Sequence, residues 1–153
     1  MLYFAYGSNM SAAVMRRRCP GAQLEGRAYL PGYRFIIMRS GYASVVAAPG
    51  DGVHGLLWRL TPREVAALNA YENLDGGLYR AVALAVVSHR RRRAARVYVG
   101  RDRTLGRPQP GYLEIVTQAA RDAGFPPYYL RSLARWASAP NNVPRTGVIF
   151  HGD

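Results

Sequence analysis

The sequence predicts an α+β fold in which a mixed, mostly antiparallel sheet curls toward a small barrel with helices on its outside. About seven segments have the alternation or apolar character of strands, and three or four have that of helices. Hairpin-like connections between strands dominate, and strands and helices do not alternate regularly. With 153 residues and 16.9 kDa, the chain has the size of one domain, which we expect to span residues 1–153.

The predicted strands are separated by turn-forming residues. A Gly-Ser-Asn turn follows the first, Pro31-Gly32 separates the second from the third, and Pro-Gly-Asp-Gly at 49–52 follows the fourth. His89 and Arg90–Arg93 connect the last two strands. In chain order, we expect strands at residues 1–6, 22–30, 33–39, 43–48, 53–60, 80–88 and 94–99.

The predicted helices begin or end at recognisable signals. Ser11–Arg18 has a basic end and is stopped by Pro20-Gly21. Thr61-Pro62-Arg63-Glu64 has the form of a capping box, which starts a helix that runs to about residue 70. Two more helices are expected at 111–123, ended by Gly124, and at 127–137.

The composition is that of a globular protein and excludes several classes of function. Hydrophobic residues make up 49% and charged residues 20%, and no apolar run reaches the roughly 18 residues of a membrane-spanning helix. The N-terminus lacks the basic leader and apolar core of a secretory signal, so we expect a cytoplasmic protein with no membrane partner. Cys19 is the single cysteine, which excludes an intramolecular disulfide and a multi-cysteine zinc site. His54, His89 and His151 share no ligand spacing, so we expect no metal site.

The charge balance narrows the available chemistry. The net charge is +12, and all 21 basic residues are arginine, so lysine chemistry is absent. Any catalytic carboxylate must be one of nine acidic residues. These are Glu25, Asp51, Glu64, Glu72, Asp75, Asp102, Glu114, Asp122 and Asp153.

Tyr6, Gly7, Ser8 and Asn9 follow the first predicted strand and form the first candidate site. Glycine permits a sharp turn, in which consecutive backbone N–H groups can point into one concavity just before a helix. Such a turn suits an anion or an oxyanion. The alternative interpretation is an ordinary turn between a strand and a helix.

Glu72 is the second candidate, in the loop after the capped helix. Neighbouring apolar and aromatic residues would raise the pKa of a buried carboxyl group toward the range of a general base. The alternative is a solvated carboxylate at a helix end. Asp75 is the runner-up acid, although a turn role before Gly76-Gly77 is the simpler interpretation. The apolar neighbours of Glu72 are Tyr71, Leu74, Leu78 and Tyr79.

Together these segments resemble the γ-glutamylcyclotransferase superfamily, including its AIG2-like members. The resemblance lies in FAYGSNM at 4–10, VHGLLWRLT at 53–61 and LNAYENLDGGLYR at 68–80. It continues in RVYVG at 96–100, QPGYLEIV at 109–116 and DAGFPPYYL at 122–130, and so covers nearly the whole chain. The YGSN motif and a glutamate seven residues before a tyrosine are jointly specific. Asn9 argues against the glutathione-specific branch, whose sequence differs after Tyr-Gly-Ser.

The resemblance implies a barrel-like mixed sheet flanked by helices, and a reaction without cofactor or metal. In that reaction the α-amino group of a small-molecule γ-glutamyl substrate displaces an amine and forms 5-oxoproline. Glu72 stands at the position of the family's catalytic glutamate. Tyr6, Gly7, Ser8 and Asn9 match its substrate-binding loop, and Tyr79, Tyr98 and Tyr112 match its pocket tyrosines. The leaving amine and the oligomeric state are left open.

Two other functions are compatible with the sequence. The first is a non-catalytic, metabolite-binding member of the fold, which would typically lack the acid. The second is a polyanion- or nucleic-acid-binding module that uses the Arg90–Arg93 hairpin. No recognition fold or aromatic stacking run accompanies these arginines, so we do not expect specific nucleic-acid binding. A nucleic-acid module would show steep salt dependence and no turnover.

Overall fold

Five strands close into a barrel in the order β1-β3-β2-β4-β5, and β5 returns to pair with β1 in parallel. The computed structural model describes residues 1–72 and 77–138. The strands are β1 (Leu2–Ala5), β2 (Gln23–Ile37), β3 (Ala43–Arg59), β4 (Tyr79–Ser88) and β5 (Arg91–Gly100). The helices are α1 (Ala12–Arg18), α2 (Pro62–Tyr71), α3 (Tyr112–Asp122) and α4 (Pro127–Ala134), with 3₁₀ turns η1 (Ser8–Met10) and η2 (Arg135–Ser138).

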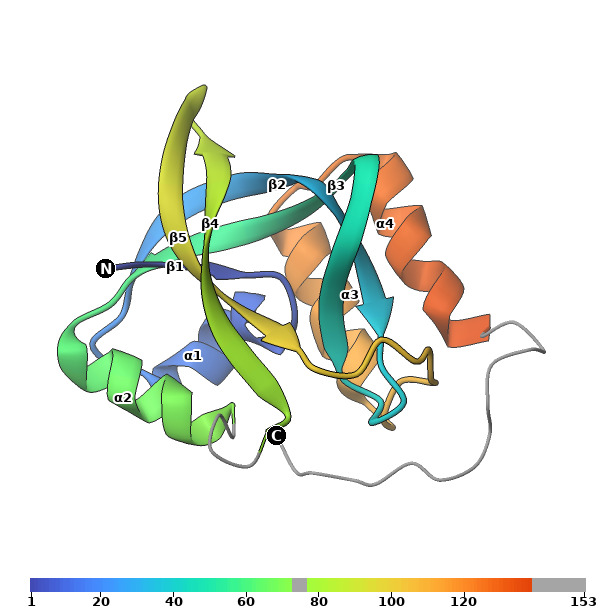
Figure 1. The fold of residues 1–153 in the computed structure, drawn as a ribbon, viewed down its shortest axis with the longest axis horizontal. Helices are drawn as coiled ribbons and strands as arrows, with labels where there is room; N and C mark the ends of the chain where they lie inside the picture. Colours follow the sequence, from blue (N-terminus) through green and yellow to red (C-terminus); the bar gives the residue numbers. More distant parts are fainter. Residues whose placement is uncertain (73–76, 139–153) are drawn as a thin grey trace.

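The predicted α+β fold with a small barrel and outer helices is confirmed. Figure 1 shows α1 and α2 at one end of the barrel and α3 and α4 at the other. Ser11 caps α1 by accepting a hydrogen bond from the Val14 amide, 3.3 Å away. Within the described residues, no helix is both long and apolar enough to span a bilayer.

The prediction of seven strands was wrong at two turn signals, because β2 and β3 each continue through one. These two strands pair antiparallel from Gln23↔Arg59 to Ile37↔Ala43. The register shifts between Pro31 and Tyr33, where Pro31 pairs with Gly52 but Tyr33 pairs with Ala47. The turn residues therefore form opposed bulges within a long ladder, and Figure 1 shows β2 and β3 as long strands that bend together. Both signals mark real irregularities, but long-range pairing on each side keeps the strands continuous.

The β4–β5 connection is shorter than predicted. Its turn consists of His89 and Arg90, whose φ angles of 50° and 64° are those of a two-residue hairpin turn. Arg91, Arg92 and Arg93 belong to β5 and pair with Ser88, Val87 and Val86. Three of the four arginines therefore lie at the start of β5, in the part of the hairpin that projects beyond the barrel (Figure 1), and only Arg90 lies in the turn.

The start of α2 was predicted correctly, but its capping box was not. Glu64 is 4% exposed, and its carboxylate accepts a hydrogen bond from the Thr61 hydroxyl. The helix N-terminus has no side-chain cap. The hydroxyl bonds the carboxylate itself because Glu64 is turned inward toward Gly21, where a Cβ would lie 2.5 Å from Glu64 Oε1. Glu64 is thus a buried residue of the first turn of α2, and its carboxylate packs against Gly21.

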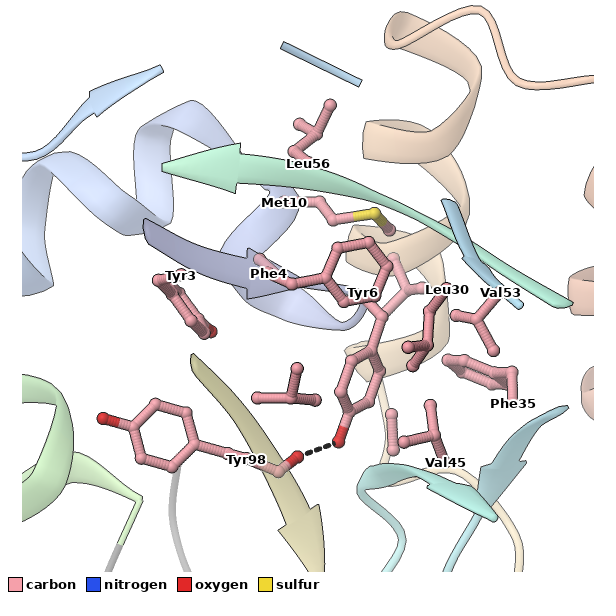
Figure 2. Packing of buried hydrophobic residues seen from close by; sticks show 14 of the residues in the cluster. Tyr3, Phe4, Tyr6, Met10, Leu30, Phe35, Val45, Val53, Leu56 and Tyr98 are labelled. Atoms are coloured by element: carbon pink, nitrogen blue, oxygen red, sulfur yellow. Dashed lines mark hydrogen bonds between the residues drawn. The ribbon is translucent and has the colours of Figure 1, made fainter. Parts of the chain in front are cut away.

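The barrel interior is filled by apolar and aromatic side chains. Phe4, Ile37 and Leu57 are fully buried, and Trp58 is 6% exposed. Figure 2 shows how the side chains of β1 and its following turn enter this core, with Phe4 and Tyr6 among Leu30, Phe35, Val45 and Val53. The core thereby fixes the end of β1, from which the candidate site is built.

Candidate functional site

A pocket lies where β1 ends, and its walls come from widely separated parts of the chain. All eight site residues predicted from the sequence line it: Tyr6, Gly7, Ser8, Asn9, Glu72, Tyr79, Tyr98 and Tyr112. Two further lining residues, Tyr3 and Ala43, were not predicted. The structure therefore brings the predicted residues together, whereas their chemical roles stay a prediction.

The turn after β1 is a 3₁₀ turn instead of a direct entry into α1. The amide of Met10 donates to Gly7 O at 3.1 Å, and that of Ser11 donates to Ser8 O at 3.0 Å. The first amides of such a turn have no partner within it, so those of Gly7, Ser8 and Asn9 are candidate donors to a ligand. Ser8 and Asn9 are buried, at 7% and 3% exposed.

The glycine at position 7 is required by packing. Its φ of −111° lies outside the left-handed region, so the backbone angle does not demand glycine. A Cβ there would lie 2.8 Å from the Tyr112 hydroxyl and 3.5 Å from Ala43 Cβ. The sequence-based reason, a sharp turn, is therefore replaced by the close approach of Tyr112.

The pocket tyrosines are held by hydrogen bonds of their hydroxyl groups. Tyr6 donates to the Tyr98 carbonyl (Figure 2), and Tyr79 donates to Ala43 O at 2.7 Å. Tyr112 accepts from Ala43 N at 3.2 Å, so two tyrosines hold the backbone of one residue. Burial raises the pKa values of Tyr3, Tyr6 and Tyr98. The nearby charge of Glu72 adds to this rise at Tyr3 and Tyr6, whereas Arg96 opposes it at Tyr98. These hydroxyls therefore stay protonated and can act as donors at neutral pH.

Glu72 stands at the C-terminal end of α2, which aims its side chain into the pocket. Its amide closes the last turn by donating to Leu68 O at 2.7 Å. Its half-buried carboxylate accepts from Asn9 Nδ2 at 3.4 Å. Of its predicted apolar and aromatic neighbours, Tyr79 lines the pocket together with Glu72, whereas Tyr71 turns toward Arg18. Leu74, Asp75 and Gly76 lie outside the described residues.

Sequence reasoning missed the residues that support the pocket from behind. Arg18 donates to Ser8 Oγ and Asn9 Oδ1, and its guanidinium lies 3.6 Å from the centre of the Tyr71 ring. Asn69 Oδ1 accepts from Tyr98 and Arg96, at 2.7 and 2.6 Å. Helical phase could have indicated Arg18, because it lies four residues after the buried Val14.

The candidate metal ligands are scattered in the part of the chain that the structure describes. Across residues 1–72 and 77–138, no three histidine, cysteine, aspartate or glutamate side chains gather in one place. His54 packs against the rings of Phe125 and Tyr129, and His89 occupies the hairpin turn. His151 lies outside the described residues.

Cys19 is expected to be inert toward alkylation, because it is 1% exposed and its thiol is held neutral. Burial, followed by the charge of Glu64, raises the pKa of Cys19 from 9.0 to about 11. At pH 8 this shift lowers the thiolate fraction about 100-fold, and the thiolate is the reactive form. The rate of iodoacetamide labelling, followed by mass spectrometry, should be at least about 100-fold slower in the native protein than in urea. Similar rates would contradict the burial of this thiol.

Comparison with known proteins identifies the lineage of this site. The profile of the family described as "Gamma-glutamyl cyclotransferase, AIG2-like" matches residues 3–117. The chain belongs to this family. The matched range of this family member includes the loop at Tyr6–Asn9, Glu72 and the three later pocket tyrosines.

Two curated relatives align with most of this chain. It is 27% identical to human γ-glutamylcyclotransferase over 159 residues, which cover 97% of this chain and 82% of the relative. It is 26% identical to the mouse γ-glutamylcyclotransferase over 143 residues, covering 86% and 76%. These relatives support a cyclotransferase-type function.

Several solved structures have the same fold as this chain. One structure described as a γ-glutamyl cyclotransferase superimposes with a TM-score of 0.84 at 26% identity, covering 97% of this chain and 93% of the other. An uncharacterised human protein gives 0.83 at 27% identity, covering 95% and 90%. A yeast cyclotransferase specific to glutathione gives 0.63 at 12% identity, covering 90% and 95%, and shares the fold alone.

Proposed function

We propose that this protein converts a γ-glutamyl amine, amino acid or peptide to 5-oxoproline and the free amine. The observation that carries the proposal is the meeting of Glu72, the YGSN loop and the tyrosines around one pocket. A carboxylate, a loop whose first amides are candidate donors and several tyrosines line the same space. This arrangement suits a reaction that needs proton transfer and a bound oxyanion.

Ring closure makes positioning the main task of the protein. The α-amino nitrogen attacks the γ-carbonyl carbon of the same molecule, so no second reactant has to be captured. Well-oriented intramolecular attack can be worth about 7–11 kcal/mol relative to an unpositioned reaction. The pocket tyrosines, fixed through Ala43 and the Tyr98 backbone, form rigid walls that would hold the glutamyl unit folded.

Glu72 would carry the two proton transfers of the reaction. It first accepts a proton from the substrate α-ammonium group, which leaves a neutral amine able to attack. Attack leaves two protons on the ring nitrogen. Glu72 returns its first proton to the leaving nitrogen as the bond between the γ-carbon and that nitrogen breaks. It then takes the second proton from the ring nitrogen and passes it to the released amine, which leaves a neutral lactam N–H and an ammonium group. Glu72 starts ionised, ends ionised, and consumes no co-reactant.

The YGSN loop would stabilise the charge that develops on the γ-carbonyl oxygen. Gly7, Ser8 and Asn9, whose amides open the 3₁₀ turn, are buried residues that line the pocket. Loss of one such donor typically costs about 3–4 kcal/mol of transition-state stabilisation. Neither a metal nor a cofactor has a step in this reaction.

A panel of γ-glutamyl compounds tests the proposal and identifies the leaving amine. The panel contains γ-glutamyl amino acids, γ-glutamyl-ε-lysine, γ-glutamyl polyamines and a carrier-tethered γ-glutamyl group. Release of 5-oxoproline is scored by mass spectrometry. Consumption of at least one compound supports the proposal. Binding of 5-oxoproline without turnover of any compound would favour the non-catalytic alternative.

Replacement of Arg90, Arg91, Arg92 and Arg93 by serine is expected to leave turnover within about threefold of the wild type. The hairpin end lies about 23 Å along β5 from Tyr98, at roughly 3.3 Å per residue. Arg93 pairs with Glu25 at 3.6 Å, and such surface pairs contribute little. The measurement is the rate of 5-oxoproline release at low and physiological salt. A collapse of turnover in a folded variant would tie the arginines to substrate capture.

A further inference from the structure

Three consecutive arginines end α1, and one of them reaches the pocket wall. Arg16 and Arg17 are exposed, whereas Arg18 is half-buried. Arg18 donates to Ser8 Oγ at 3.2 Å and to Asn9 Oδ1 at 2.5 Å, both in the YGSN loop. It also donates to the Tyr71 hydroxyl and stacks on that ring. One guanidinium therefore joins the loop to the residue that precedes Glu72.

The contact with Arg18 determines how the Asn9 amide is oriented. A guanidinium can only donate hydrogen bonds, so the group of Asn9 that faces it must be the carbonyl oxygen. The NH₂ group then points the opposite way, toward Tyr3 Oη at 2.9 Å and Glu72 Oε1 at 3.4 Å. A flipped amide would place two donors face to face at Arg18 and two oxygens face to face at Glu72.

The rest of Asn9 is also held in place. Its backbone carbonyl oxygen accepts a hydrogen bond from the Trp58 indole at 3.0 Å, and the residue is 3% exposed. Without the guanidinium, the backbone would stay anchored, but the side-chain amide would lose the hydrogen bond to its oxygen and keep only those of its NH₂ group to Tyr3 and Glu72. Arg18 therefore affects Glu72 indirectly, through the orientation of the Asn9 side-chain amide.

We propose that Arg18 is a positioning residue that fixes the Asn9 amide so that its NH₂ group donates to ionised Glu72. This inference rests on the proposed function, because it needs Glu72 as the base. Donation to the ionised form favours that form, since the protonated carboxyl accepts the hydrogen bond less well. The bond also aims the carboxylate, and a misplacement of about 1 Å can cost about 100-fold in rate.

The test compares Arg18→Met with Arg17→Met, a matched change one residue away on the same helix. Arg18→Met should lower kcat/KM by about 10- to 100-fold, whereas Arg17→Met should leave it within about twofold. The acidic limb of the pH profile of kcat/KM should move to higher pH in Arg18→Met, because a carboxylate that loses a donor holds its proton more tightly. Arg18→Lys, which can still donate to Asn9 Oδ1, should recover part of the rate and of the profile.

A double-mutant cycle shows whether Arg18 acts through Asn9. If it does, Arg18→Met should lower kcat/KM by no more than about threefold in an Asn9→Ala background. Fully additive losses, or an unshifted acidic limb in folded Arg18→Met, would overturn the proposal. If Arg18→Met fails to fold, Arg18→Lys and the Asn9 variant decide by the same pH profile.

An NMR measurement separates this inference from the proposed activity. Protein labelled with ¹⁵N-asparagine should show slowly exchanging Asn9 side-chain protons in the wild type and in Arg17→Met. In Arg18→Met these protons should exchange faster, whether or not any γ-glutamyl compound is consumed. Unchanged exchange in Arg18→Met would overturn the role of Arg18. Absence of 5-oxoproline with faster exchange would overturn the activity alone.

Discussion

Glu72→Gln is expected to lower the rate of 5-oxoproline formation by about 10³- to 10⁴-fold. General acid–base groups typically contribute 10²–10⁴-fold, and a residue that serves both proton transfers belongs at the upper end. Glutamine keeps the shape of the side chain and one oxygen, but it cannot accept a proton at neutral pH. Binding of substrate should survive, because the loop and the tyrosines provide the walls of the pocket. The measurement is turnover of whichever compound the wild type consumes.

Asp75→Asn is the control, since Asp75 is the other acid of the same segment. It should keep turnover within a few-fold of the wild type. If Glu72→Gln stays within tenfold while Asp75→Asn is inactive, the base is Asp75. Binding of 5-oxoproline by calorimetry shows that each variant retains its pocket. A Glu72→Gln protein that binds 5-oxoproline yet does not turn over substrate is the expected result.

The barrel could be predicted from local patterns, but the number of strands could not. Pro31-Gly32 and the Pro-Gly-Asp-Gly segment at 49–52 are strong turn signals. They lie opposite each other in the β2–β3 ladder, so two interruptions became one shared irregularity. Whether a turn signal ends a strand or bends it depends on the partner strand. That partner lies 6 residues away along the chain at one end of the ladder, Ile37↔Ala43, and 36 residues away at the other, Gln23↔Arg59, and local sequence does not reveal it.

The front of the candidate site was predictable, and the support behind it was not. Tyr6–Asn9 and Glu72 occupy motif positions, and the structure places both on one pocket. Arg18, by contrast, is one of three identical neighbours in a chain whose every cation is arginine. Helical phase indicates that Arg18 lies on the buried side of α1 with Val14, but its contacts with Ser8, Asn9 and Tyr71 depend on how the helix packs. Tyr3 was hidden in the same way, within a strand expected simply to be buried.

Gly7→Val is the second variant with a large expected effect, a loss of at least about 100-fold in 5-oxoproline release from a folded protein. The first side-chain atom at this position would lie 2.8 Å from the Tyr112 hydroxyl, well inside van der Waals contact. Tyr112 is 8% exposed and bound to the Ala43 amide, so it has little room to retreat. The loop must therefore shift away from the pocket, and its amides lose their alignment with the developing oxyanion. The measurement is turnover beside circular dichroism and thermal melting.

Removal of the Tyr112 hydroxyl group tests whether its clash with a side chain at position 7 causes the loss of activity. Gly7→Ala should also lose activity, because its Cβ meets the same oxygen. In the double variant Gly7→Ala with Tyr112→Phe, the nearest atom to the new Cβ becomes Ala43 Cβ at 3.5 Å, an ordinary contact. Tyr112→Phe alone leaves the Ala43 amide without this acceptor, at a cost of about 1–3 kcal/mol. The double variant should nevertheless be more active than Gly7→Ala, because the loop can return to its place. If it is less active than both single variants, the hydroxyl is not what excludes a side chain at position 7, and glycine is required there by the ligand itself.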